Sequence, residues 1–127
     1  MGLIVAGVDG FEELIAWQKA RELTKRVYQV TREGAWARDF GLGGQIQRAA
    51  VSIMSNIAEG SERGSKEFHQ YLVTAKASAA EVRSQLFVAL DIGYIDQNTF
   101  NELYDLSVEV GRITGALRAS VARRLAQ

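Results

Sequence analysis

The sequence predicts an all-α protein, an antiparallel four-helix bundle in up-down-up-down order. Apolar residues recur at spacings of three and four along most of the chain, which is the pattern of amphipathic helices. Proline is absent, and no stretch of useful length alternates as a strand would. The 127 residues suit one domain, so we expect an apolar tail over residues 1–8 and the bundle over residues 9–127. Short breaks between long helices favour antiparallel neighbours.

The first helix is expected to begin after an N-cap at Asp9, because Glu12 three residues later completes a capping-box pattern. Its core-facing residues recur at helical spacing and are Ala16, Ala20, Leu23, Val27 and Val30. Gly34 is expected to end this helix. Residues 35–44 contain three glycines, and we expect them to form a turn.

The second helix is expected to run to about Gly60, and its apolar residues are Leu42, Ile46, Ala49 or Ala50, Ile53 and Ile57. A loop over residues 60–65 follows, in which Ser65 is expected to cap the third helix. The third helix has the clearest pattern, with Phe68, Leu72, Ala75, Ala79, Val82, Leu86 and Ala89 on one face. We expect Gly93 to end it and Asp96 to cap the fourth helix. The fourth helix carries Phe100, Leu103, Leu106, Val110, Ile113, Leu117 and Val121 on its apolar face.

The composition excludes several classes of chemistry. Cysteine is absent, which excludes disulfides, cysteine–zinc sites and thiol catalysis. The single histidine, His69, follows Lys66 by three residues, so the Glu-x-x-His pairs of di-iron bundles are missing. We therefore expect no metal, no cofactor and no enzymatic activity. Apolar runs fall short of the ~20 residues of a membrane span, which predicts a cytoplasmic protein with no membrane partner.

Polar residues recur near helical spacing in the second and third helices and the loop between them. The set comprises Arg48, Ser52, Asn56, Glu59, Arg63, Glu67 and Glu81. We favour a structural or interfacial hydrogen-bond network, in which Arg48 pairs with Glu81, because a buried charge requires a partner. The alternative is a catalytic carboxylate site, in which Glu59, Glu67 and Glu81 act as acid, base or metal ligands.

Small residues form a second pattern. In the fourth helix they recur every fourth residue, at Ser107, Gly111, Gly115 and Ala119, although glycine in a helix costs about 1 kcal/mol relative to alanine. The third helix carries Ala77 and Ala80 beside its main apolar seam. One interpretation is close helix packing within the chain, and the other is an interface between subunits, because small residues let helix backbones approach closely.

Cations gather on one predicted face although the chain is neutral overall, with 15 Lys plus Arg against 15 Asp plus Glu. They lie on the outer face of the first helix and in the turn after it, at Arg21, Lys25, Arg32 and Arg38. One interpretation is a solvated surface. The other is contact with the phosphates of RNA or DNA, which would position nucleic acid without reading its sequence.

One string in the second helix is characteristic of a family. Residues 48–60 read RAAVSIMSNIAEG, and Arg63, Glu67, Phe68 and Tyr71 follow. This string resembles the four-helix bundle proteins encoded within intervening sequences of bacterial large-subunit rRNA genes. The resemblance implies a ring-like homo-oligomer, a pentamer, with no known activity. A related branch, the accessory variability proteins of retroelements, binds nucleic acid through strongly basic surfaces, whereas the net charge here is 0.

Three hypotheses of function follow from these observations. The first is a non-enzymatic homo-oligomeric bundle that associates with RNA or DNA through the cations of the first helix. The second is a scaffold for a partner protein without nucleic-acid binding, which the neutral net charge favours. The third is an enzyme with a carboxylate site between the second and third helices.

Overall fold

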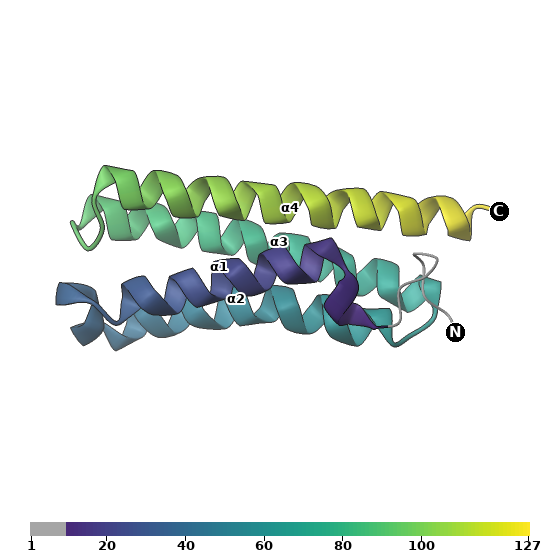
Figure 1. Cartoon of the computed structure of the whole chain (residues 1–127), viewed down its shortest axis with the longest axis horizontal. Helices are drawn as coiled ribbons and strands as arrows, with labels where there is room; N and C mark the ends of the chain where they lie inside the picture. The colour runs from purple at the N-terminus through teal and green to yellow at the C-terminus, as the bar shows by residue number, and fades with distance from the viewer. Residues whose placement is uncertain (1–9) are drawn as a thin grey trace.

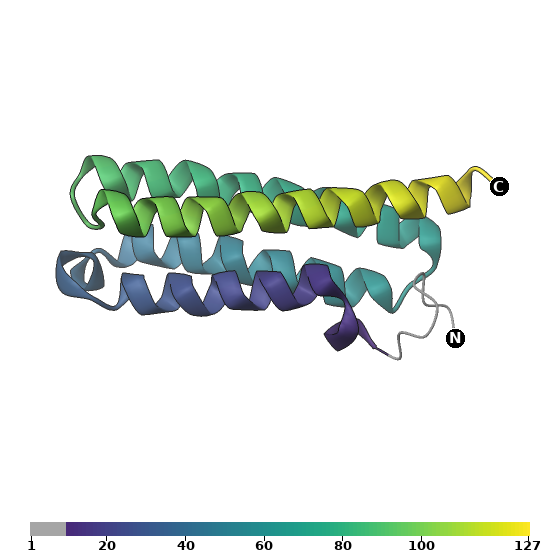
Figure 2. The ribbon, with the colours of Figure 1, turned by 45° about the horizontal axis from the view of Figure 1, so that its top comes forward.

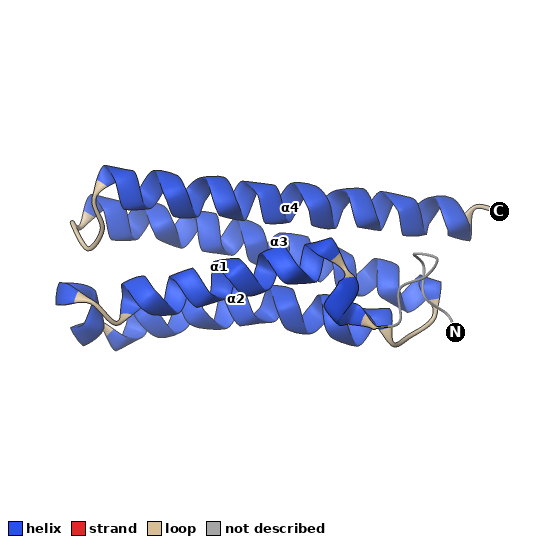
Figure 3. Cartoon of the chain, in the orientation of Figure 1, coloured by secondary structure: helices blue, strands red, loops and turns tan. Residues whose placement is uncertain are grey.

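The computed structural model describes residues 10–127 as four long helices and two short 3-10 turns. In chain order these elements are η1 (Phe11–Glu13), α1 (Ile15–Thr31), η2 (Gly34–Arg38), α2 (Phe40–Ser61), α3 (Ser65–Asp91) and α4 (Gln97–Leu125). The chain reverses direction at each connection between the long helices (Figure 1). The described residues contain no strand (Figure 3), which confirms the predicted all-α, four-helix architecture.

The four helices surround one core, and each packs against two neighbours. Both α1 and α3 contact α2 and α4, so α1 and α3 lie on a diagonal of the bundle (Figure 2). The helix α4 has 29 residues against 17 in α1, and it extends well past the start of α1 (Figure 1). Among residues 10–127, no helix is both long and apolar enough to cross a membrane.

The start of α1 differs from the prediction. The predicted N-cap, Asp9, lies outside the described residues, as does the predicted apolar tail at 1–8. The α-helix begins at Ile15, because Phe11–Glu13 form a 3-10 turn in which the Leu14 N–H donates to the Phe11 carbonyl at 3.0 Å. The Phe11 ring packs edge-on against Trp17, with the ring centroids 5.1 Å apart, and this contact fixes the turn against the helix.

The start of α2 also corrects the prediction, because the turn expected at residues 35–44 is shorter. The helix begins at Phe40, where Asp39 Oδ1 accepts a hydrogen bond from the Leu42 N–H at 3.1 Å and so caps the helix. The glycines that suggested a turn therefore lie within the first two turns of α2. Gly43 is buried beside Trp36 of η2. The Trp36 side chain is 1% exposed and fills this end of the bundle.

The first helix ends at Thr31, three residues before the predicted Gly34, which begins η2. The remaining helix ends follow local sequence signals except at the start of α3. Gly64, not the predicted Ser65, is the N-cap of α3, and no side chain caps this helix end. Gly93 follows the C-cap of α3 with φ +82°, as predicted for the left-handed position that glycine tolerates. Asp96 caps α4 as predicted, accepting from the Thr99 N–H at 2.8 Å.

The core contains most of the predicted apolar residues. Ile53, Leu72 and Leu103 are examples of side chains with no exposed surface. By contrast Leu42, Leu106, Ile113 and Leu117 are only partly buried. The three from α4 line grooves between α4 and α1, because the shorter α1 covers this side of α4 incompletely.

Candidate functional site

The outer face of α1 presents three exposed cations, Arg21, Lys25 and Arg32. The α-helical rise places Arg21 about 6 Å from Lys25 and Lys25 about 10 Å from Arg32 along the helix. Arg38, in η2, is also exposed at the end of the bundle that Arg32 approaches. All four predicted cations are therefore accessible to a partner that follows α1 toward η2.

These four cations have no carboxylate within 4 Å in the described chain, whereas the cations of α1 that face α4 are paired. Arg26 Nη2 lies 2.7 Å from Glu102 Oε1, and Lys19 Nζ lies 3.6 Å from Glu109 Oε1. The hydrogen bond from Arg26 lowers the pKa of Glu102 below its usual value. The bundle thus neutralises one side of α1 and leaves the charge on the other side unmatched.

Two of the unmatched arginines rest on aromatic rings of the same helix. The Arg21 guanidinium lies 5.7 Å from the Trp17 ring centroid, and the Arg32 guanidinium lies 5.2 Å from that of Tyr28. Both contacts join residues four apart, which face the same side of a helix. Cation–π attraction restricts the side chains while it leaves their charge available to an anion.

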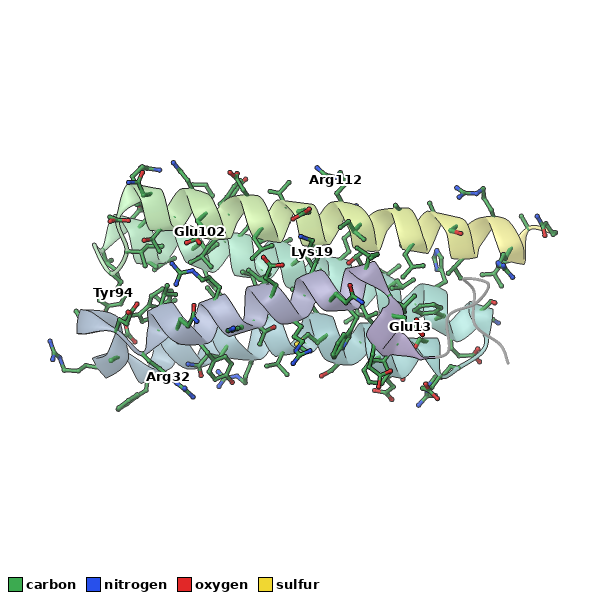
Figure 4. The ribbon with its side chains drawn as sticks, in the orientation of Figure 1. Glu13, Lys19, Arg32, Tyr94, Glu102 and Arg112 are labelled. Atoms are coloured by element: carbon green, nitrogen blue, oxygen red, sulfur yellow. The ribbon has the colours of Figure 1, made fainter. Side chains whose placement is uncertain are left out.

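A groove of about 690 Å³ separates α1 from α4, and its walls carry both signs of charge. Lys19 and Glu102 lie between the two helices in Figure 4, and Arg112 of α4 also lines the groove. The basic side chains of the groove include Lys25 and Arg26, and the acidic ones include Glu22 and Glu109. This mixture of charges makes the groove itself a poor site for a polyanion. Lys25 lies at the edge of the groove, where it also borders the outer face of α1.

The predicted polar strip joins α2 to α3. The Ser52 and Ser78 hydroxyl oxygens are 3.0 Å apart, and Asn56 Nδ2 donates to the Ser52 carbonyl at 2.8 Å. Farther along α2, Glu59 Oε2 accepts from Arg63 Nη2 and from the Tyr71 hydroxyl, each at 3.0 Å. The hydrogen bond to Glu59 raises the pKa of Tyr71. Ser52 with Asn56, and Glu59 with Arg63, therefore form two separate hydrogen-bonded groups of the kind that a structural interpretation requires.

The predicted pair of Arg48 and Glu81 does not form, although both line a groove of about 380 Å³ beside Ser52. The Arg48 guanidinium lies back over Gly44, where a Cβ would stand 3.0 Å from Nη1. The absence of a side chain at Gly44 explains why Arg48 turns there.

Of the predicted catalytic carboxylates, Glu59 is engaged by Arg63 and Tyr71, and Glu67 lies beside Gly64 at the start of α3. Within residues 10–127, no three histidine, aspartate or glutamate side chains are placed to hold a metal ion. The alternative of a catalytic site formed by Glu59, Glu67 and Glu81 therefore gains no geometric support.

The small residues separate into two groups. Ser107 and Gly111 are buried, and Gly111 and Gly115 face α3. A Cβ on Gly111 would lie 3.4 Å from Arg83 Nη1, and one on Gly115 would lie 3.5 Å from Lys76 Cε. These two glycines therefore pack against α3 within the chain, although an alanine at either position would make only an ordinary contact there. Ala119 is half-buried farther along α4. By contrast, the alanines of the third helix, Ala77 and Ala80, are exposed.

The outer face of α3 carries an exposed stripe without charged side chains from residue 73 to residue 88. Its members are Val73, Ala77, Ala80, Ser84, Phe87 and Val88. Phe87 packs partly against Phe100 and Tyr104 of α4, but 48% of its surface remains exposed. The stripe is thus an exposed surface of small and apolar residues on one helix.

Sequence reasoning missed one exposed aromatic residue. Phe40 was grouped with a turn, but it begins α2 and is 83% exposed. The available signal was Asp39, because an aspartate three residues before a helical N–H is a typical N-cap. Recognising that cap would have placed Phe40 at the first helical position, outside the core pattern that starts near Leu42.

Comparison with known proteins identifies a family and a similar solved structure. A family model described as 23S rRNA-intervening sequence protein matches residues 12–116. A solved structure of a protein with unknown function from the S23 ribosomal protein family of Bacteroides thetaiotaomicron superposes with a TM-score of 0.77. The two chains are 20% identical, and the match covers 83% of this chain and 96% of the other, so it supports a common fold. No curated protein matches the sequence significantly.

Proposed function

The chain belongs to the 23S rRNA-intervening sequence protein family, and from that premise we propose that it is a non-catalytic, homo-oligomeric bundle that contacts RNA through the outer face of α1. One observation carries the proposal: Arg21, Lys25, Arg32 and Arg38 are exposed and have no carboxylate within 4 Å, while Lys19 and Arg26 are paired across the groove to α4. Unpaired cations on one helix face can exchange condensed counterions for phosphates.

The neutral total charge is compatible with this function because several acidic residues lie away from the outer face of α1, although the exposed Glu33 directly follows Arg32. Glu102 and Glu109 lie in the groove between α1 and α4, and Glu59 is engaged between α2 and α3. The cations of α1 therefore produce a local positive field that the net charge conceals. Such contacts would hold an RNA backbone without selecting its sequence.

The homo-oligomeric part of the proposal rests on the opposite side of the bundle. The uncharged stripe of α3 offers a second copy of the chain an apolar surface with two small residues, Ala77 and Ala80, near its centre. Small residues at the centre of a helix face allow another helix to approach closely. Because α3 is diagonal to α1, assembly through α3 leaves the cations of α1 accessible, and each copy adds one more contact surface for the same RNA.

The proposal is tested by changing Arg21, Lys25 and Arg32 together to glutamate. Fluorescence anisotropy with a structured ribosomal RNA fragment, measured across a salt series, should show strong binding by the wild type and its loss in the variant. If three phosphate contacts disappear, the slope of log affinity against log salt should fall by about two. Circular dichroism should show an unchanged fold, since all three side chains are exposed.

A matched control changes three exposed cations far from the outer face of α1 and from the α3 stripe, Lys66, Arg123 and Arg124, to glutamate. This control alters the net charge by the same amount, so it should retain most of the affinity. Equal losses in the two variants would assign the effect to net charge and contradict a specific surface on α1. A wild type without RNA affinity at low salt would refute the RNA function and leave a protein-partner scaffold.

A further inference from the structure

A pocket of about 350 Å³ opens where α1 ends and α2 begins, between η2 and the first turns of α2. Arg32 projects at this end of the bundle, the end that also holds Tyr94 (Figure 4). The pocket is lined by Arg32, Phe40 and Gln47 at its sides and by Gly43 and Gly44 along α2. Its volume lies near the lower limit of ligand pockets, about 300–1,000 Å³, which suits a small planar group.

The Phe40 ring forms an exposed wall of this pocket because the core position nearby is already occupied. Trp36 is buried under η2 and stacks on Tyr94 with the ring centroids 5.8 Å apart. Asp39 fixes the start of α2 through its bond to the Leu42 N–H, and this start directs Phe40 to solvent with 83% of its surface exposed. Both faces of an aromatic ring can be used for stacking when so little of it is covered.

One basic side chain, Arg32, lines this pocket, and Arg38 precedes Phe40 by two residues in the chain. Arg32 and Arg38 have no carboxylate within 4 Å, and the Arg48 guanidinium lies over Gly44 at the edge of the pocket. The acid that lines the pocket, Asp39, is engaged inside the protein, since its two oxygens accept from the Leu42 N–H at 3.1 Å and the Tyr94 hydroxyl at 2.9 Å. The pocket therefore combines an exposed ring with unmatched positive charge.

Gln47 supplies hydrogen-bonding capacity inside the pocket. Its Nε2 donates one hydrogen bond to Thr31 Oγ1 at 2.9 Å, and its carbonyl oxygen accepts none from the described residues. One N–H and the carbonyl oxygen therefore remain for a ligand that both donates and accepts. The edge of a nucleobase has this character, whereas an aliphatic side chain does not.

We propose that this pocket receives an unpaired base of a single-stranded nucleic acid, stacked on Phe40, with the adjoining phosphates on Arg32 and Arg38. The inference rests on the proposed function, which uses phosphate contacts alone, and it adds a preference for single strands over duplexes. In a duplex each base is already stacked and paired, so no base can lie on the Phe40 ring without being extruded. Stacking on an aromatic side chain contributes about 1–3 kcal/mol for each base and tolerates any sequence.

The test is the Phe40→Ala variant, measured by anisotropy with a labelled single strand and with a duplex of the same length. The variant should lose roughly 5- to 150-fold in affinity for the single strand, the fold-change that corresponds to one lost stacking contact. Its affinity for the duplex and its salt slope should equal those of the wild type, because no phosphate contact is removed. Phe40→Trp should keep or raise the single-strand affinity.

Val51→Ala is the matched control, since Val51 is also an exposed apolar residue of α2 and does not line the pocket. This control should bind both nucleic acids as the wild type does. Oligo(U) and oligo(dT) arms of the same assay show whether the single strand is RNA or DNA. Phe40 is so exposed that its removal should leave the fold unchanged, which circular dichroism verifies.

Several outcomes would overturn the inference. Unchanged single-strand affinity in Phe40→Ala refutes the base pocket, and the salt dependence of the wild type then still tests the function of α1 separately. Equal losses for single strand and duplex would contradict stacking. A change of native mass in Phe40→Ala would assign the ring to contact between copies. If the wild type binds no RNA, titration with a mononucleotide, followed through the NMR signals of Phe40 and Gln47, still decides whether the pocket takes a base.

Discussion

Replacing Gly60 with alanine should destabilise the protein, although alanine is the better helix former. A Cβ at this position would lie 2.6 Å from Tyr71 Cβ and 2.9 Å from Phe68 Cδ1. Carbon atoms in contact are normally about 3.5–4.0 Å apart, so the overlap is about 1 Å. The backbone of α3 fixes Tyr71 Cβ, so no side-chain rotation relieves the clash and the two helices must separate.

The magnitude follows from two opposing contributions. Alanine gains about 1 kcal/mol over glycine in a helix interior, and less near the end of a helix such as α2. Overpacking a fitted contact costs about 1–3 kcal/mol, and this contact is at the severe end of that range. We therefore expect a net loss of about 1–2 kcal/mol in the free energy of unfolding. For a domain of this size the melting temperature should fall by roughly 4–8 °C.

The assay is thermal and urea unfolding followed by circular dichroism, with Gly115→Ala as the matched control. A Cβ on Gly115 would meet the flexible end of Lys76 at 3.5 Å, which is an ordinary contact. This control should stabilise the protein by up to about 1 kcal/mol, since only the helix-forming gain remains. A Gly60→Ala variant as stable as the wild type would refute the close approach of α2 and α3 at this point.

Two further predictions concern pH and assembly. Asp39→Asn should destabilise the protein at neutral pH, because hydrogen bonds from Leu42 and then from Tyr94 lower the pKa of Asp39 in the folded state. A carboxyl group whose pKa is lowered in the folded state stabilises that state above its unfolded pKa, near 4. In urea-unfolding curves, the difference in free energy of unfolding between variant and wild type should therefore vanish as the pH falls below that value. A difference that stays constant from pH 7 to pH 2 would contradict this account. Ala80→Glu places a charge at the centre of the α3 stripe and should reduce the native mass toward that of a monomer. The control Ala116→Glu, on the exposed surface of α4, should leave the native mass unchanged. Equal masses for the Ala80→Glu variant and the wild type would exclude α3 as the surface between copies.

The characteristic string of α2 acquires a physical explanation in the fold. Gly60 lets Phe68 and Tyr71 of α3 pack closely against α2, and Tyr71 then reaches Glu59 with its hydroxyl group. About two turns earlier in α2, the Ser52 hydroxyl lies 3.0 Å from that of Ser78 in α3, and Asn56, about one turn earlier, bonds to Ser52. The string can therefore be understood as the contact that fixes α2 on α3.

The sequence by itself determined the number of helices, most of their core residues and two of their ends. Helical periodicity is a local property, and so are the cap at Asp96 and the positive φ of Gly93, because each depends on residues within one turn. The cations of α1 could be located in the same way, since residues seven and four apart share a helix face. The start of α2 was missed because its three glycines suggested a turn and Asp39 was not recognised as an N-cap.

The tertiary structure decided which helix each face meets. Periodicity defines an apolar or charged face without naming its neighbour, so it could not separate the paired Arg26 from the unpaired Arg32. The partner of Arg26, Glu102, is 76 residues away in the chain. Similarly, the glycines of α4 face α3, whereas Ala77 and Ala80 are exposed. Phe40 is exposed because Trp36 and Tyr94, which are 58 residues apart in the chain, fill the end of the bundle. Contacts between residues so distant in the chain depend on how the helices pack, which no local pattern encodes.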